Sequence, residues 1–245
     1  MKTMKIITLK EGDFIVNDKK DILLLEGKGQ DSKTGLKLAI QPFLVITDDD
    51  YILLDTGLGR LMNGSTALEF LLEQNDIQPS QITKILISHL HKDHIGGIGY
   101  FKEDRFNFSF LNAEIFVQQR ELDQALKEQD HIKYDYAILN QLTSHPKLVL
   151  LQQDQGSINE YVSYWVSGGH TQYHQVFWIK KDGETIFYGG DDLPQRAYLE
   201  RHISFKAEYD GKKGSDIRNI WKQTAEREHW TILLYHDMKN AILKF

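Results

Sequence analysis

The sequence predicts an α/β fold in which helices pack on the outside of β-sheets. Two observations predict it: strand-like and helical runs alternate in the first half, and a meander of strand-like runs follows from Lys147. No low-complexity tract or long linker divides the 245 residues, a length that allows one large domain or two small ones. We expect a single domain over residues 1–245.

The first half is expected to begin with short strands and to add helices later. Strands are expected at Phe14–Val16, Ile22–Leu25, Phe43–Thr47, Tyr51–Leu54, Ile82–Ile87 and Ala113–Val117. Gly27–Gly35 indicates a loop, and Asp48–Asp50 a hairpin turn. Helices are expected at Ser65–Asn75, which Ser65 or Thr66 can cap, and at Glu121–Gln129.

The second half is dominated by strand-like runs. Strands are expected at Leu148–Leu151, Tyr161–Val166, Gln175–Ile179, Thr185–Tyr188 and Thr231–Tyr235. Asp182-Gly183 predicts a tight hairpin turn because both residues tolerate positive φ. A late helix is expected at Gln223–His229.

Composition excludes several classes of protein. The absence of cysteine excludes disulfide frameworks, thiolate metal sites and cysteine nucleophiles. A net charge of −6 shows no basic footprint, so no nucleic-acid partner is expected. No run approaches the length of a membrane span, and Met1–Lys10 lacks the apolar core of a secretory signal. We therefore expect a cytoplasmic protein with no membrane partner, and the sequence leaves its oligomeric state open.

The strongest chemical signal is the segment Ser88–Gly97, directly after a β-run. It places His89, His91, Asp93 and His94 within six positions. Imidazole and carboxylate are the usual ligands of zinc and of comparable transition metals. Gly96 and Gly97 then allow close backbone approach. The segment therefore predicts a metal site rather than a histidine-rich surface loop.

Three later segments each place a histidine or an aspartate just past a strand-like run. They contain His170, Asp191 and His236. Loops that follow strands commonly carry active sites, so these residues are candidates to complete a site for two metals. Taken alone each signal is weak, and it is their shared position that gives them weight.

The whole pattern resembles the metallo-β-lactamase-fold hydrolase superfamily. His89, His91, Asp93 and His94 match its H-x-H-x-D-H motif, and His170, Asp191 and His236 match its later metal ligands in order. Leu54-Asp55-Thr56-Gly57 resembles its early Asp-Thr-Gly turn. The resemblance covers about residues 40–238. It implies a four-layer αββα sandwich and a metal-dependent hydrolase.

The resemblance also implies roles for these residues. His89, His91 and His170 would hold one metal, Asp93, His94 and His236 the other, and Asp191 both, while Asp55 would orient a ligand imidazole. Two divalent metals, zinc first and manganese or iron otherwise, would hold a bridging hydroxide as the nucleophile. Asp93 or Asp191 would carry the proton. The alternative for Asp55 is a carboxylate that only caps its turn.

Among the activities of the family, the compact acyl-homoserine lactonases are the most similar. Those lactonases typically carry a tyrosine three residues after the bridging aspartate, where this chain has Pro194. Tyr198 lies nearby and is a candidate substrate contact, as is Lys206 in the basic stretch Arg196–Arg218, which could equally be a solvated loop. The phenylalanines of Phe101–Phe110 suggest core packing, or else a wall for an acyl chain.

The function we expect is hydrolysis of a small ester, lactone or thioester by a dinuclear centre. One alternative is a phosphodiesterase acting on a small nucleotide or nucleic acid. Another is a metal-binding scaffold without turnover. The acidic balance of the chain favours the acyl substrates over nucleic acid.

Overall fold

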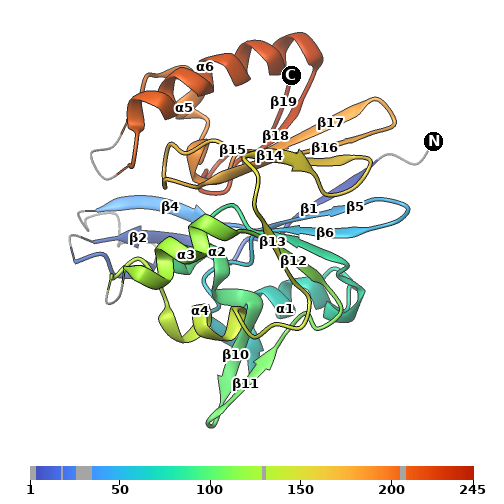
Figure 1. Cartoon of the computed structure of the whole chain (residues 1–245), viewed down its shortest axis with the longest axis vertical. Helices are drawn as coiled ribbons and strands as arrows, with labels where there is room; N and C mark the ends of the chain where they lie inside the picture. The colour runs from blue at the N-terminus through green and yellow to red at the C-terminus, as the bar shows by residue number, and fades with distance from the viewer. Residues whose placement is uncertain (1–3, 18, 26–34, 129–130, 205–207) are drawn as a thin grey trace.

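The computed structural model describes residues 4–17, 19–25, 35–128, 131–204 and 208–245. Two six-stranded sheets face each other, with helices on both outer sides (Figure 1). This arrangement confirms the α/β sandwich that the resemblance implied. No helix within these ranges is long and apolar enough to cross a membrane.

The first sheet carries parallel strands at its centre. Its spatial order is β1 (Lys5–Thr8), β5 (Phe43–Ile46), β6 (Tyr51–Leu54), β9 (Lys84–Leu86), β12 (Glu114–Gln118) and β13 (Leu148–Leu151). The pairs β6–β9, β9–β12 and β12–β13 are parallel, whereas β1–β5 and β5–β6 are antiparallel. Parallel strands bring their carboxyl ends to one edge, where ligands commonly bind.

The second sheet is mostly antiparallel. Its order is β14 (Gln155–Ser157), β15 (Val162–Val166), β16 (Gln175–Lys181), β17 (Glu184–Tyr188), β18 (Thr231–Leu233) and β19 (Ile242–Lys244). Asp182 and Gly183 join β16 to β17 with φ of 53° and 83°, which confirms the predicted hairpin turn. Strands β17 and β18 are parallel, and the crossover between them carries two helices.

Smaller elements complete the chain. A three-stranded sheet has the order β3 (Ile22–Leu24), β2 (Gly12–Val16) and β4 (Leu36–Ile40). Two hairpins are also present. One pairs β7 (Leu61–Met62) with β8 (Ser65–Thr66), and the other pairs β10 (Gly99–Lys102) with β11 (Arg105–Phe108). The helices are α1 (Ala67–Glu73), α2 (Lys92–Ile95), α3 (Gln119–Lys127), α4 (Tyr136–Leu142), α5 (Ala197–Glu200) and α6 (Gly211–Glu228), with 3₁₀ turns at Pro79–Gln81, Gly96–Ile98 and Gly190–Asp192.

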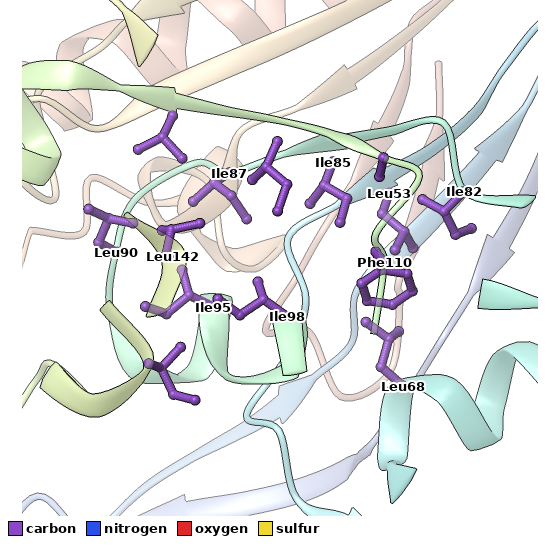
Figure 2. Close-up of a cluster of buried hydrophobic side chains, with 14 of the residues drawn as sticks. Leu53, Leu68, Ile82, Ile85, Ile87, Leu90, Ile95, Ile98, Phe110 and Leu142 are labelled. Carbon is purple, nitrogen blue, oxygen red and sulfur yellow. The ribbon is translucent and has the colours of Figure 1, made fainter. Parts of the chain in front are cut away.

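Three apolar clusters hold the layers together. The first lies between the first sheet and helices α1, α3 and α4, and Figure 2 shows Leu53, Ile85 and Leu142 within it. The second fills the space between the two sheets, and the third packs α5 and α6 against the second sheet. Each of the two large sheets is therefore packed on both of its faces.

Local sequence signals explain where α1 begins. Thr66 accepts a hydrogen bond from the Glu69 N–H, and the Glu69 carboxylate accepts one from the Thr66 N–H. This reciprocal capping box confirms Thr66, one of the two predicted caps. The buried Leu68 and Leu72 form the inner face of the helix.

Two sequence expectations need correction. The late helix begins at Gly211 instead of Gln223, because Asp210 caps the Lys213 N–H and buried Ile217 and Trp221 continue the inward face. The stretch Arg196–Arg218 is thus not simply a solvated loop, since it contains α5 and the start of α6.

The elements β1, β4, α4 and the β10–β11 hairpin were not predicted at all. The predicted loop Gly27–Gly35 falls almost wholly outside the described residues.

Candidate metal centre

The candidate metal ligands come from loops at one end of the two facing sheets. His89 follows β9, His170 follows β15, Asp191 follows β17 and His236 follows β18. These loops belong to strands of both sheets, so the packing of the sheets brings together residues far apart in sequence. All seven predicted ligands meet here, in two groups that could each hold a metal ion.

The first group consists of His89, His91, His170 and Asp191, whose ligand atoms all lie within 4.8 Å of one another. His91 Nδ1 lies 2.9 Å from His89 Nε2 and 3.1 Å from His170 Nε2. Asp191 Oδ2 lies 3.3 Å from His170 Nε2. Three imidazoles and one carboxylate oxygen are a donor set typical of zinc.

The second group consists of Asp93, His94 and His236. Asp93 Oδ2 lies 3.9 Å from His94 Nε2 and 3.6 Å from His236 Nε2. The other oxygen of Asp191, Oδ1, lies 3.3 Å from His94 Nε2 and 3.0 Å from His236 Nε2. Asp191 therefore turns one oxygen toward each group, which is the geometry of a bridging carboxylate.

Hydrogen bonds on the far side of the rings orient the imidazoles. His94 Nδ1 lies 2.7 Å from Asp55 Oδ2, and His236 Nδ1 lies 2.6 Å from the carbonyl oxygen of Ala39. Each partner accepts a hydrogen bond from Nδ1–H and so leaves the unprotonated Nε2 facing the centre. Partners of this kind fix the tautomer and raise the basicity of a ligand imidazole.

Buried polar atoms that lack a hydrogen-bond partner show whether the two ligand groups suit metal ions. Asp191 Oδ1 and His94 Nε2 are buried and have no hydrogen-bond partner in the described part of the chain. Buried polar atoms are nearly always paired, so an oxygen and a nitrogen that lie 3.3 Å apart without a hydrogen bond indicate a partner from outside the chain. A divalent cation between them would satisfy both atoms. The imidazole and carboxylate donors, and the two buried atoms without hydrogen-bond partners, therefore fit two metal ions that share Asp191.

The pKa values of the histidines differ between the two groups. Burial and the neighbouring imidazoles hold the pKa of His89 well below its usual range, and burial lowers the pKa of His170 to about 4. Burial also opposes the charged form of His94, but Asp191 and Asp55 outweigh it and raise its pKa well above the ordinary value. The imidazoles of the first group are therefore neutral, the form that binds metals.

Asp55 forms hydrogen bonds with several residues next to the second group. Its buried carboxylate accepts hydrogen bonds from the Ser88 N–H and hydroxyl, both at 2.7 Å, and from the Tyr188 hydroxyl at 2.5 Å. Its backbone has a φ of 56°, a conformation that aspartate tolerates better than most residues. Asp55 thus ties the β6 loop, the His89 loop and β17 together while it contacts His94.

Sequence reasoning missed a second buried carboxylate, Asp192. It accepts the N–H of His170 at 2.6 Å and that of Gly169 at 3.2 Å, and its Oδ2 lies 3.3 Å from His174 Nδ1. His174 Nε2 in turn accepts the Asp191 N–H at 3.1 Å. The doublet Asp191-Asp192 was the available signal, but only its first member matched a family position.

Glu121 in α3 was missed as well, because nothing in its helical sequence context marks it. Its buried carboxylate accepts a hydrogen bond from the Thr171 hydroxyl at 2.9 Å. Burial raises the pKa of this carboxyl. Glu121 therefore ties helix α3 to the loop that carries His170.

The predicted close approach at Gly96 and Gly97 is present. A Cβ at Gly96 would lie 2.2 Å from the Leu58 carbonyl oxygen, and one at Gly97 would lie 2.0 Å from that of Thr56. The Thr56 N–H donates to the His94 carbonyl at 2.7 Å. The two glycines thus let α2 rest directly on the loop that follows Asp55.

A cavity of about 260 Å³ opens on the metal ligands. Apolar side chains of the β3–β2–β4 sheet and the following loops line it, among them Val16, Ile22, Leu36, Leu38 and Ile132. The predicted substrate contact Tyr198 lines this cavity, as does Pro194. The other predicted contact, Lys206, lies outside the described residues.

The phenylalanine-rich stretch does not line the cavity. Phe110 is buried in the first apolar cluster, Phe106 packs against that cluster, and Phe101 is 41% exposed on the β10–β11 hairpin. This hairpin projects from the lower end of the molecule (Figure 1). Core packing, the interpretation that the sequence favoured, describes Phe106 and Phe110, and the cavity wall comes from other segments.

Comparisons with known proteins identify the family. The model of the metallo-β-lactamase superfamily matches residues 38–215. The N-acyl homoserine lactonase AiiA of Bacillus thuringiensis subsp. kurstaki is 24% identical over 226 residues, which cover 83% of each chain. The probable metallo-hydrolase YybB of Bacillus subtilis is 23% identical over 215 residues, covering 86% of this chain and 90% of that one.

Solved structures show the same fold. A probable metal-dependent hydrolase from Staphylococcus aureus superposes with a TM-score of 0.78 at 19% identity, covering 100% of this chain and 94% of its own. AidC, a dizinc quorum-quenching lactonase solved with a product N-hexanoyl-L-homoserine, gives 0.68 at 24% identity, covering 84% of this chain and 75% of its own. With the family model matching most of its length and the ligand loops assembled as described, this chain belongs to the metallo-β-lactamase superfamily and is a metal-dependent hydrolase.

Proposed function

We propose that the protein hydrolyses small esters, lactones or thioesters with an apolar acyl portion at a centre of two metal ions. The observation that carries this proposal is the cavity, in which one side is the His/Asp centre and the other is an apolar wall. A cavity that is mainly apolar, with a few convergent polar groups, suits a small ligand with one reactive polar function. An acyl chain that ends in an ester carbonyl has this form.

Seven side chains would hold the ions. We assign His89, His91 and His170 to one, Asp93, His94 and His236 to the other, and Asp191 to both. Zinc is the expected metal, because the donors are imidazole and carboxylate and the dizinc lactonase AidC shares the fold. When bound, such ions lower the pKa of water toward neutrality and polarise the oxygen of the electrophile.

The protein's own groups then position the substrate and move protons. Tyr198 lines the cavity, and burial and the nearby Asp191 raise the pKa of its phenol, so its hydroxyl keeps its proton and can donate to the substrate carbonyl. Pro194 occupies the position where the lactonases of the family typically carry their tyrosine. We therefore assign that contact to Tyr198. Asp93 and Asp191, beside the reacting atoms, are the candidates to carry the proton to the leaving group.

Lactones are the first substrates to test, because AiiA and AidC are both named as lactonases. The protein should be reconstituted with Zn²⁺, Mn²⁺ or Fe²⁺, and kcat/KM measured on matched panels of acyl lactones, aryl esters, thioesters and phosphodiesters. We expect the best acyl substrate to exceed the best phosphodiester. A phosphodiester better by tenfold, about 1.4 kcal/mol of transition-state binding, would overturn the acyl assignment.

A further inference from the structure

The cavity wall carries three lysines in addition to its apolar side chains. Lys20 follows β2, Lys92 is the first residue of α2, and Lys133 lies in the loop between α3 and α4. The Lys92 N–H donates to the Lys133 carbonyl oxygen at 2.9 Å, which holds these two segments side by side. Three separate segments therefore place lysines in the lining of the cavity that opens on the metal ligands.

Lys92 and Lys133 combine partial burial with the lack of an ion pair among the residues that the structure describes. Lys84 forms an ion pair with Asp50 at 2.5 Å, and Lys212 forms one with Asp216 at 2.6 Å. Lys92 and Lys133 are half-buried, yet neither forms an ion pair with a carboxylate in the ranges that the structure describes. Partly desolvated ammonium groups are costly without a partner, and an anion in the cavity would supply one.

The carboxylates that line the cavity already have other partners. Asp93 and Asp191 lie among the metal-binding histidines. Glu208 lies close enough to the buried Arg218 to oppose the lowering of its pKa by burial. Lys133 lies near the metal centre, since it lines the same cavity as His91 and the ring of the adjacent Tyr134 lies 5.6 Å from the ring of His91, between centroids. A short acyl chain could therefore connect an anionic group bound by these lysines to the reacting carbonyl at the metal centre.

We propose that Lys92 and Lys133 bind an oxyanion on the substrate, so that the enzyme prefers acyl compounds whose chain ends in a carboxylate. This inference rests on the proposed acyl hydrolysis. The metal side of the cavity holds the scissile carbonyl, Leu36 and Ile132 contact the methylene groups, and the two ammonium groups bind the end of the chain. A phosphonate offers the same oxyanion chemistry and is tested beside the carboxylate.

A kinetic experiment compares two esters that differ only at the end of the chain. 4-Nitrophenyl pentanoate ends in a methyl group, and mono-4-nitrophenyl glutarate ends in a carboxylate. We expect the metal-loaded enzyme to favour the glutarate ester, and the Lys92→Met/Lys133→Met variant to lower that preference, as the ratio of kcat/KM values, by about tenfold. Lys102→Met, an exposed change on β10 outside the cavity, is the matched control and should keep the ratio. An unchanged ratio in the double variant would overturn the inference.

A binding experiment separates this inference from the proposed function. Isothermal titration of the metal-loaded protein with glutarate, pentanoate and 4-phosphonobutanoate measures the contribution of the second anion without turnover. We expect glutarate to bind about tenfold more tightly than pentanoate, and the double variant to lose this advantage. Equal affinities of the wild type for glutarate and pentanoate would refute the anion site. Tighter binding of 4-phosphonobutanoate than of glutarate would retain the anion site but refute the carboxylate preference. A retained preference for glutarate, with no hydrolysis of any ester, would refute the proposed function and leave the anion site standing.

Discussion

The metal side and the apolar side of the cavity are built in different ways. The metal side comes from loops at strand ends between the two large sheets, and buried hydrogen bonds such as those to Asp55 fix its side chains. The apolar side comes from the small β3–β2–β4 sheet and a loop, and Leu36 and Ile132 there are 50% and 49% exposed. If the protein acts as proposed, its metal ligands are held in place by buried contacts, and its substrate preference depends on a partly exposed surface that can change at little cost to folding.

The largest effect is expected on the metal side, at Asp191. Asp191→Ala removes a carboxylate that faces both ligand groups, so both of the proposed ions would lose a ligand. We expect kcat/KM to fall by roughly a thousandfold, since hydroxide activation and charge stabilisation are each worth several kcal/mol. Steady-state kinetics and elemental analysis of the metal content would measure this.

The matched control for that change is Asp216→Ala. Asp216 is an exposed carboxylate on α6 that pairs with Lys212, and its loss should leave kcat/KM and the metal content within about twofold of wild type. Full activity and two bound ions in Asp191→Ala would contradict the bridging assignment. An equal loss in both variants would instead indicate a general effect on folding.

Asp55 is expected to give the next largest effect, on stability as well as on metal affinity. Asp55→Ala leaves the Ser88 N–H, the Tyr188 hydroxyl and His94 Nδ1 without their acceptor. We expect a loss of about 3 kcal/mol or more in the free energy of unfolding and a 10–100-fold weaker Zn²⁺ affinity, as is typical when such a partner is removed. Chemical denaturation and chelator competition would measure the two quantities.

Asp55→Asn is the informative companion. Asparagine tolerates the positive φ of this position and keeps one acceptor oxygen, so it should retain most of the backbone structure. If the amide oxygen keeps the hydrogen bond from the Ser88 N–H, the NH₂ group takes the place of Oδ2 and cannot accept the hydrogen bond from His94 Nδ1–H, so Zn²⁺ affinity should remain weakened. If Asp55→Asn bound zinc as tightly as wild type, Asp55 would be a structural carboxylate that only holds its turn.

The sequence could predict the metal side because its signal is local. Four ligands lie within six residues, and the other three follow strand-like runs in the family's order. Asp192 and Glu121 escaped prediction because their roles depend on contacts with loops that lie far away in the chain. A buried acid within a helix or next to a ligand looks like any exposed acid until the fold is known.

The apolar side could not be predicted for the same reason. Leu36 and Leu38 belong to β4, which was not predicted as a strand, and their contact with the cavity depends on how the small sheet packs against the rest of the molecule. The phenylalanine run was the more conspicuous apolar signal in the sequence, but it lies in the first core and on the projecting hairpin. Composition shows which residues avoid water and gives no indication of which cavity they face.

A smaller effect is expected where the two sides join, at Glu11. Glu11 directly precedes β2, and its carboxyl accepts the Leu58 N–H of the loop after Asp55 at 3.1 Å. Burial raises the pKa of Glu11 to about 8 from an ordinary 4.5. The folded protein therefore keeps a proton that the unfolded chain loses, and stability contributed by this group is lost as the pH rises from about 4.5 through about 8.

Glu11→Gln tests this coupling, because glutamine imitates the protonated carboxyl. Urea denaturation at pH 5 and at pH 9 should show that the variant gains stability relative to wild type at the higher pH. The gain is expected to be a few kcal/mol, at about 1.4 kcal/mol per unit of pKa shift. The same pH dependence of stability in both proteins would mean that Glu11 ionises at its ordinary pKa. The contact between Glu11 and the loop after Asp55 would then be open to water.

The smallest effect is expected on the apolar side, at Leu36. Leu36→Ser removes an apolar side chain that is half exposed and lines the cavity, so folding should change little while long acyl chains lose a contact. We expect the ratio of kcat/KM for 4-nitrophenyl octanoate over 4-nitrophenyl acetate to fall about fivefold, or roughly 1 kcal/mol for partial burial of a leucine. Leu61→Ser is the matched control, because Leu61 is 55% exposed on β7 and does not line the cavity. If the ratio falls equally in both variants, or in neither, the β3–β2–β4 sheet does not contact the acyl chain, and the contrast between the two sides of the cavity fails as an account of specificity.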